Sequence, residues 1–252
     1  MNPITNIATK AVKSGGKVVS YGFVPDNSQN DSKAQDYLAA VEKKAEEEII
    51  NTIKRYYPEH KIYNTKNKKI HGDENSDYIW AINPITSKSN FIRGIPVFAC
   101  AVTILIKNKI YTEAIFNPIT NDLYTATEGE GARCNNYRIR SKENTFVEAV
   151  TVHNNEKAKT KDKDQTDLLN TLINKNIKIV STGCKVMDMA YLATNKIDAI
   201  ININEDKNQE QITQGYLVTK ESGLIISHIN SSKITASYKT NMEIMQDIKK
   251  VQ

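Results

Sequence analysis

The sequence predicts an α/β protein, and three observations along the chain lead to this class. Two amphipathic helical segments come first, a run of short apolar strands follows, and strands then alternate with helices up to the C-terminus. The chain has 252 residues, of which 39% are hydrophobic and 25% are charged, as in an ordinary soluble protein with a sizeable core. We therefore expect one large domain or two modest ones.

The two helical segments are recognised by apolar residues that recur at steps of three and four. In the first segment these residues are Ile4, Ile7, Ala8, Ala11 and Val12. In the second they are Leu38, Val41, Ala45, Ile49 and Ile53. The polar stretch VPDNSQNDSKAQ between them predicts a loop, and Tyr57-Pro58 ends the second helix because a residue before proline disfavours helical dihedrals.

The middle of the chain predicts an antiparallel meander. Tyr78–Ile82 and Val97–Ile106 are apolar runs of strand length, and the second is apolar enough for a central strand. Turns at Asn108-Lys109 and Asn121-Asp122 separate the strands that follow, and two more short strands surround Gly129 and Gly131.

The rest of the chain predicts a layered α/β half. We expect strands at residues 149–152, 177–180, 197–203 and 224–228, and helices at residues 168–173, 185–193, 212–221 and 242–249. The polar segment 153–166 predicts a linker. The natural division is an N-terminal half, residues 1–140, and a C-terminal half, residues 141–252, within one continuous domain.

Composition also limits the class of protein. No run approaches 18 apolar residues and the N-terminus lacks a signal-peptide core, so we expect a cytoplasmic protein. Cys100, Cys134 and Cys184 are isolated, without a CxxC pair, which favours reduced thiols. The net charge of +5 is mild and supports a nucleic-acid face only weakly.

The stretch WAINPITSKSNF, residues 80–91, is the most informative local feature. It is an apolar strand that stops at Pro84 and continues into hydroxyls, amides and the amine of Lys88. Polar groups just past a strand end, at a helix start, often form ligand sites in α/β folds. This stretch contains no acid, so its composition suits an anion better than a metal ion.

This stretch, together with NPITNDLYTATEGEGARCNNYRIR and STGCKVMDMAYLATNKIDAI, resembles the inositol monophosphatase family. The similarity covers nearly the whole chain and is greatest to the bacterial extragenic suppressor branch. It implies a layered αβαβα sandwich of the inositol monophosphatase/sugar phosphatase type and a homodimer. It also implies that residues 1–140 form the half that holds the metal site in the family.

Active members of this family hydrolyse phosphate monoesters with Mg²⁺ held by carboxylates. Their motif reads W-x-I-D-P-x-D-G-T-x-N-F. In this chain the two metal-binding aspartates of the motif are Asn83 and Thr86, and the threonine that helps to orient the attacking water is Lys88. The family's adjacent Glu-Glu pair is Thr65-Lys66 here.

At other motif positions this chain also has residues that differ from those of the family. The family's Trp-Asp pair is Glu210-Gln211 here, and an upstream acid that contacts the inositol is Asn204. The turn that packs on the substrate reads Gly183-Cys184-Lys185-Val186. Glu42 stands where the family has an aspartate, and Lys33 matches a lysine of the family's mobile loop.

The charges of these positions decide what the resemblance implies. Five family acids carry about −5, whereas one lysine and four neutral residues give +1 here; these five are Thr65, Lys66, Asn83, Thr86 and Gln211. A lysine about 4 Å from a divalent cation is repelled by roughly 8 kcal/mol at an effective dielectric constant near 20. Asp73, Glu74 and Asp77 read as a solvated loop rather than as substitute ligands. We therefore expect no metal and no catalytic residues.

Three functions remain open. The first is an inactive pseudophosphatase that acts through protein contacts, because the suppressor branch is associated with antitermination of ribosomal RNA genes through NusA and RNA polymerase. The second is an active Mg²⁺-dependent inositol monophosphatase with substitute ligands. The third is a metal-free binder of a phosphorylated metabolite, with anion-binding candidates at Lys33, Lys66, Ser87, Lys88 and Lys185. The alternative to this third function is that the site is a relic whose residues changed by mutational drift.

Overall fold

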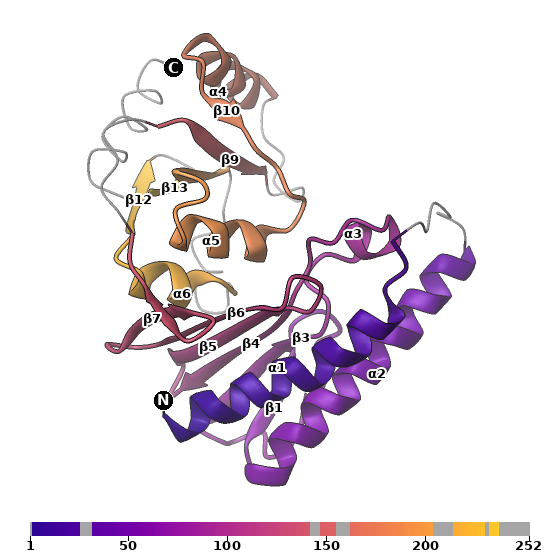
Figure 1. The fold of residues 1–252 in the computed structure, drawn as a ribbon. Coiled ribbons are helices and arrows are strands. Elements are labelled where there is room, and N and C mark those ends of the chain that lie inside the picture. The colour runs from indigo at the N-terminus through magenta and orange to yellow at the C-terminus, as the bar shows by residue number, and fades with distance from the viewer. Residues whose placement is uncertain are drawn as a thin grey trace.

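The protein is built from five stacked layers. The computed structural model describes residues 2–25, 32–141, 147–154, 162–203, 214–229 and 232–236. Helices α1 (Pro3–Gly22) and α2 (Ser32–Tyr56) cover one face of a large sheet, and α5 (Lys185–Ala193) and α6 (Tyr216–Glu221) separate it from a smaller sheet. Helix α4 (Asp162–Asn174) lies beyond the smaller sheet (Figure 1). This order confirms the layered αβαβα sandwich that the resemblance implied.

The large sheet has eight strands in the order β2-β1-β3-β4-β5-β6-β7-β8. Their bounds are β1 Lys61–Asn64, β2 Ile70–His71, β3 Tyr78–Asn83, β4 Cys100–Ile106, β5 Lys109–Asn117, β6 Asp122–Thr127, β7 Gly131–Cys134 and β8 Tyr137–Ile139. Only β1 and β3 pair in parallel, and the other neighbours are antiparallel. The meander expected from the short apolar runs therefore forms most of this sheet.

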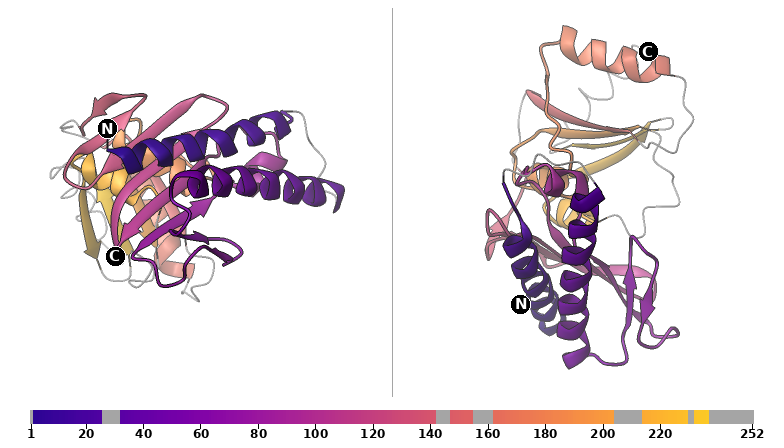
Figure 2. Two further views of the ribbon diagram at one scale, coloured as in Figure 1. Left: turned by 90° about the horizontal axis from the view of Figure 1, so that it is seen from below. Right: turned by 90° about the vertical axis from the view of Figure 1, so that its right-hand side faces the viewer.

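The smaller sheet has five described strands in the order β10-β9-β11-β13-β12. Their bounds are β9 Ala149–Asn154, β10 Lys178–Ile179, β11 Ala199–Ile203, β12 Ile225–Ile229 and β13 Ser232–Ala236. Strands β10, β9 and β11 are parallel, as expected for strands joined by helices, while β13 runs antiparallel to both of its neighbours. The right-hand view of Figure 2 shows the smaller sheet stacked above the large one.

The core between α1, α2 and the large sheet reflects the side-chain periodicities of helices and strands. Alternate residues of β4, Cys100, Val102 and Ile104, face the helices. Gly15 lies in the middle of α1, where a Cβ atom would come 2.6 Å from Cγ1 of Ile49 on α2. Glycine weakens a helix interior, so its presence here is explained by the close approach of the two helices.

Several boundaries differ from those expected. Helix α4 begins at Asp162, inside the segment expected to be a linker, and Lys33 lies in the first turn of α2 instead of in a loop. Strands β1, β2 and β13 were not predicted, because each is short and lacks a clear alternation of apolar and polar residues. The helix expected at residues 242–249 lies outside the described residues. None of the described helices is long and apolar enough to cross a membrane.

Candidate functional site

The site is built where β3 leaves the large sheet. Asn83 is the last residue of β3 and is buried, and Lys88 opens the short helix α3 (Lys88–Ile92) with Ser87 at its N-cap. Thr86 between them is fixed by two bonds to Ala99, because its N–H donates to the Ala99 carbonyl at 2.9 Å and its Oγ1 accepts from the Ala99 N–H at 2.9 Å. The sequence correctly predicted a polar turn that leads into a helix start.

Lys88 forms the central ion pair of this site. Its Nζ lies 2.5 Å from Oε2 of Glu42 on α2, and the two side chains are 42% and 15% exposed. The resemblance predicts that both residues stand where the family has a different residue, a threonine and an aspartate. Glu42 balances the positive charge of Lys88 within one contact that joins α2 to α3.

Three buried side-chain oxygens, on residues close in sequence to Glu42 or Lys88, have no hydrogen-bond partner among the described residues. They are Oε1 of Glu42, Oε1 of Glu46 and Oδ1 of Asn83. Glu46 lies one turn after Glu42 on α2, and its other oxygen, Oε2, accepts from Nδ2 of Asn67 at 3.3 Å. These oxygens are the acceptors that a rival metal-binding function would have to use.

Thr65 and Lys66 follow β1, the parallel neighbour of β3. Thr65 donates both its N–H and its hydroxyl to the Ile82 carbonyl, at 3.0 and 3.2 Å, which places it one residue from Asn83. The N–H of Lys66 donates to Oδ1 of Asn64 at 2.8 Å, and the Lys66 side chain is exposed. The neutral Thr65 is thus brought to the end of β3, while the charge of Lys66 is solvated.

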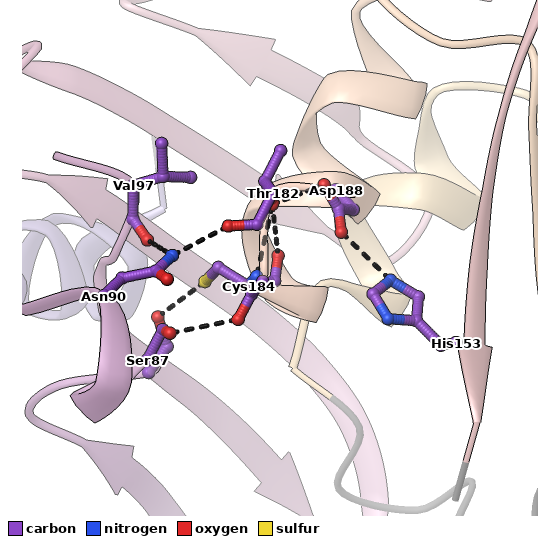
Figure 3. A network of polar contacts seen from close by, with 9 residues as sticks. Ser87, Asn90, Val97, His153, Thr182, Cys184 and Asp188 are labelled. Atoms are coloured by element: carbon purple, nitrogen blue, oxygen red, sulfur yellow. Dashed lines mark hydrogen bonds and ion pairs between the residues drawn. The ribbon is translucent and has the colours of Figure 1, made fainter. Parts of the chain in front are cut away.

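A network of polar contacts joins this turn to the loop before α5 (Figure 3). Oγ of Ser87 donates to the Gly183 carbonyl at 3.0 Å, and Nδ2 of Asn90 donates to the carbonyls of Val97 and Thr182 at 2.7 and 2.8 Å. Gly183 has φ +74°, and a Cβ there would lie 2.9 Å from Oδ1 of Asn90. Glycine is therefore required by both the backbone conformation and the packing.

The same network continues into the smaller sheet through a fully buried acid. Asp188 on α5 accepts from Oγ1 of Thr182 at 2.6 Å, and its Oδ2 lies 3.0 Å from Nε2 of His153 on β9. Sequence reasoning missed this pair, since Asp188 and His153 stand 35 positions apart without any local pattern. We interpret the pair as structural, because the approach of the two side chains holds α5 against β9. Among the described residues the acid is hydrogen-bonded through Oδ1 alone, since Oδ2 of Asp188 and Nε2 of His153 face each other without hydrogen-bond geometry.

Cys184 lies at the centre of this network but has the properties of an inert thiol. Its Sγ is 3.1 Å from Oγ1 of Thr86, and the residue is buried at the N-cap of α5. Burial raises the pKa of the Cys184 thiol, so the thiol stays protonated at neutral pH. All three cysteines are free, and their partial or full burial agrees with the expectation of reduced, non-catalytic thiols.

The remaining candidate residues lie on other elements of the fold. Lys33 is exposed on α2 and Lys185 is partly buried as the first residue of α5. Asn204, Glu210 and Gln211 lie outside the described residues. The grouping of Lys33, Lys66 and Lys185 with Lys88 around one pocket stays a prediction.

The acids considered as substitute metal ligands lie at the start of β3, whereas the candidate site lies at its end. Asp73, Glu74 and Asp77 are exposed and precede Tyr78, the first residue of β3, whereas Asn83 is the last. Six residues of strand span roughly 20 Å, so these carboxylates cannot reach the turn. They form the solvated loop that the sequence predicted.

The donor set at the turn matches Mg²⁺ poorly. Magnesium prefers charged carboxylates, but Asn83 offers an amide, Thr86 offers a hydroxyl already bonded to Ala99, and Lys88 places a positive charge beside Glu42. Among the described residues, no group of three or more His, Cys, Asp and Glu side chains is placed to hold a metal ion.

The five layers and the polar turn after β3 define an αβαβα sandwich of the sugar phosphatase type. The profile of the Inositol monophosphatase family matches residues 1–246, and the chain therefore belongs to this family.

Individual relatives agree with this assignment. Nus factor SuhB of Pasteurella multocida is 30% identical over 234 residues, which cover 91% of this chain and 86% of the relative. The extragenic suppressor protein suhB of Bartonella henselae has the same fold, with a TM-score of 0.81 at 21% identity over 99% of both chains. An inositol monophosphatase from Anabaena has a TM-score of 0.75 at 18% identity over 98% of this chain and 95% of its own.

Proposed function

We propose that this protein is an inactive member of the inositol monophosphatase family that acts through contacts with other proteins. The ion pair between Lys88 and Glu42 is the observation that carries the proposal. It puts an ammonium group into the turn where the family motif places metal-binding acids, and it uses the carboxylate of Glu42 for internal charge balance. The amide of Asn83 and the hydroxyl of Thr86 add no negative charge that could hold a divalent cation.

The partner class is proposed by analogy with the Nus factor relatives. The relatives named Nus factor SuhB cover most of this chain, and a role in a protein assembly does not need hydrolysis. We infer a role in antitermination of ribosomal RNA transcription, with NusA and RNA polymerase as partners, and a homodimer as the working assembly. A cytoplasmic location follows from this role.

The decisive test is hydrolysis. We expect purified protein to release no phosphate from inositol monophosphate above background with millimolar Mg²⁺, and calorimetry to detect no saturable Mg²⁺ site. A chelator is also expected to leave the melting temperature unchanged. Turnover or Mg²⁺ binding that is abolished by Glu42→Gln, the matched neutral variant, would instead establish an active enzyme with substitute ligands.

A pull-down experiment with the protein as bait tests the proposed partner class. Capture of NusA or RNA polymerase from a bacterial extract by the wild type, and equally by Lys88→Met, would support a role that does not depend on the degenerate site. Failure of purified NusA and purified polymerase to bind would reject this partner class while leaving the absence of catalysis intact.

The alternative, a metal-free binder of phosphorylated metabolites, requires available ammonium groups. Lys88 is one of the predicted anion-binding candidates, but its charge is balanced by Glu42 at 2.5 Å. We therefore expect inorganic phosphate to bind weakly, if at all, and Lys88→Ala to change its affinity less than twofold. A saturable phosphate site lost in Lys88→Ala would favour the binder instead.

A further inference from the structure

A cluster of aromatic rings lies at the end of the large sheet that is opposite the β3 turn. Tyr57 follows α2, His60 precedes β1, and Tyr78 opens β3. The His60 ring stacks on Tyr57 with a centroid distance of 4.6 Å and an interplanar angle of 9°, and on Tyr78 at 4.4 Å and 4°. Three nearly parallel rings therefore form one stack at this edge.

The tautomer of His60 is fixed by the only tryptophan in the chain. Nε1 of Trp80, which can only donate, lies 3.0 Å from Nδ1 of His60. Nδ1 must therefore be unprotonated, and a neutral His60 carries its proton on Nε2. Burial lowers the pKa of His60, which agrees with a neutral ring at physiological pH. The ring thus retains an N–H donor for which the described residues provide no hydrogen-bond acceptor.

A hollow of about 340 Å³ opens beside this stack, within the usual range of small-ligand sites. Its lining includes Tyr57, His60 and Tyr78, the aliphatic Ile106 and the phenol of Tyr111, and it contains no ionised side chain. The Tyr111 hydroxyl accepts from Nδ2 of Asn2 at 2.5 Å, which leaves its own hydrogen for another acceptor. The hollow thus combines ring surfaces with two uncommitted donors.

We propose that this hollow is a binding site for an uncharged, planar nitrogen heterocycle of the purine-base class. Because Tyr57 and Tyr78 cover both faces of His60, the surface for stacking is the outer face of the Tyr78 ring, which is 38% exposed and can stack with any π-system. The N–H of His60 and the O–H of Tyr111 match the acceptor nitrogens of such a ring, and the absence of charge in the lining disfavours phosphorylated or ionic ligands. The site lies at the end of β3 remote from Asn83, so it is independent of the degenerate phosphatase site.

Trp80 provides a direct readout of this site, because its indole bonds to His60 and no second tryptophan contributes. We expect titration with adenine to change the tryptophan fluorescence saturably. Inositol, which is uncharged and not aromatic, should leave it unchanged. A linear response to adenine, or an equal response to inositol, would overturn the proposal.

Variants separate stacking from general structural effects. Tyr78 is 38% exposed at the start of β3, so Tyr78→Ala should fold and weaken adenine binding at least tenfold, while Tyr78→Phe keeps the ring and the affinity. Tyr111→Phe, which removes a donor, should weaken binding several-fold. Tyr137→Ala alters an 80% exposed ring on β8 and should have no effect. Unchanged affinity in both Tyr78→Ala and Tyr111→Phe would show that the hollow is not the binding site.

Discussion

The double variant Asn83→Asp, Thr86→Asp is expected to remain without a Mg²⁺ site, whereas the triple variant that adds Lys88→Thr is expected to gain one. The first two changes restore the acids of the family motif at the end of β3. They leave the Lys88 ammonium group paired with Glu42 beside the restored carboxylates. Because Lys88 opposes a divalent cation there, the third change removes the main electrostatic barrier.

The expected gain is measurable by two independent methods. Calorimetry should show Mg²⁺ binding at least tenfold tighter in the triple variant than in the double variant. If the new dissociation constant is about 1 mM, then about 10 mM Mg²⁺ stabilises the fold by roughly 1.4 kcal/mol. At roughly 2–4 °C per kcal/mol for a chain of this size, the melting temperature should rise by about 3–6 °C.

The matched control keeps the charge at position 88. Lys88→Arg in the double-variant background should bind no Mg²⁺, because the guanidinium remains ionised. Equal Mg²⁺ affinity in the double and triple variants would mean that Lys88 does not oppose a metal ion, and the ion pair with Glu42 would then not support the proposed absence of catalysis.

The sequence predicted those features that have a local pattern. The faces of α1 and α2 follow from apolar spacing, and α5 was expected with the bounds Lys185–Ala193 that it has. The layered architecture came from the resemblance, since no periodicity determines how two sheets stack. The resemblance also predicts, without coordinates, that Asn83 and Thr86 replace the motif acids, because the flanking Trp80 and Phe91 anchor the comparison.

Contacts between distant positions could not be predicted in the same way. The sequence suggested Lys88 as an anion ligand, but the structure pairs it with Glu42, 46 positions earlier in the chain. Strand β13 was missed because its sequence has no strand pattern of its own, and its place in the sheet depends on pairing with the distant β11. The ring stack around His60 likewise arises from a loop and a strand that meet only in the folded sheet.

Glu113 is the second residue for which a large effect is expected, and it lies between the large sheet and α6. Its carboxylate is fully buried on β5 and accepts from the N–H groups of Gly215 and Val218 at 2.6 and 3.1 Å, and from Oγ1 of Thr103 at 3.0 Å. Burial raises the pKa of Glu113 from 4.5 to about 7, although the donated hydrogen bonds act in the opposite direction. The group therefore titrates near neutrality in the folded protein.

The free energy of unfolding depends on pH because Glu113 binds its proton more tightly in the folded state than in the unfolded state. Between pH 4.5 and about pH 7 the folded state holds a proton on Glu113 that the unfolded state has released, so the stabilisation from this group is fully present below pH 4.5. It is lost as the pH rises through about 7. At 1.36 kcal/mol per pKa unit, the free energy of unfolding contributed by Glu113 should fall by about 3 kcal/mol over this window.

Glu113→Gln removes this titration while keeping the side-chain shape. The free energy of unfolding of the wild type minus that of the variant, measured by urea denaturation, should fall by about 3 kcal/mol as the pH rises from about 5 to about 8. The variant should also be less stable by a constant amount, because its amide group presents a donor toward the backbone N–H groups that now reach the carboxylate. Glu47→Gln, which changes an exposed glutamate on α2, is the control and should leave the pH profile unchanged. Parallel curves for wild type and Glu113→Gln would show that Glu113 does not titrate in this range, and the pH sensitivity of the contact between β5 and α6 would then be excluded.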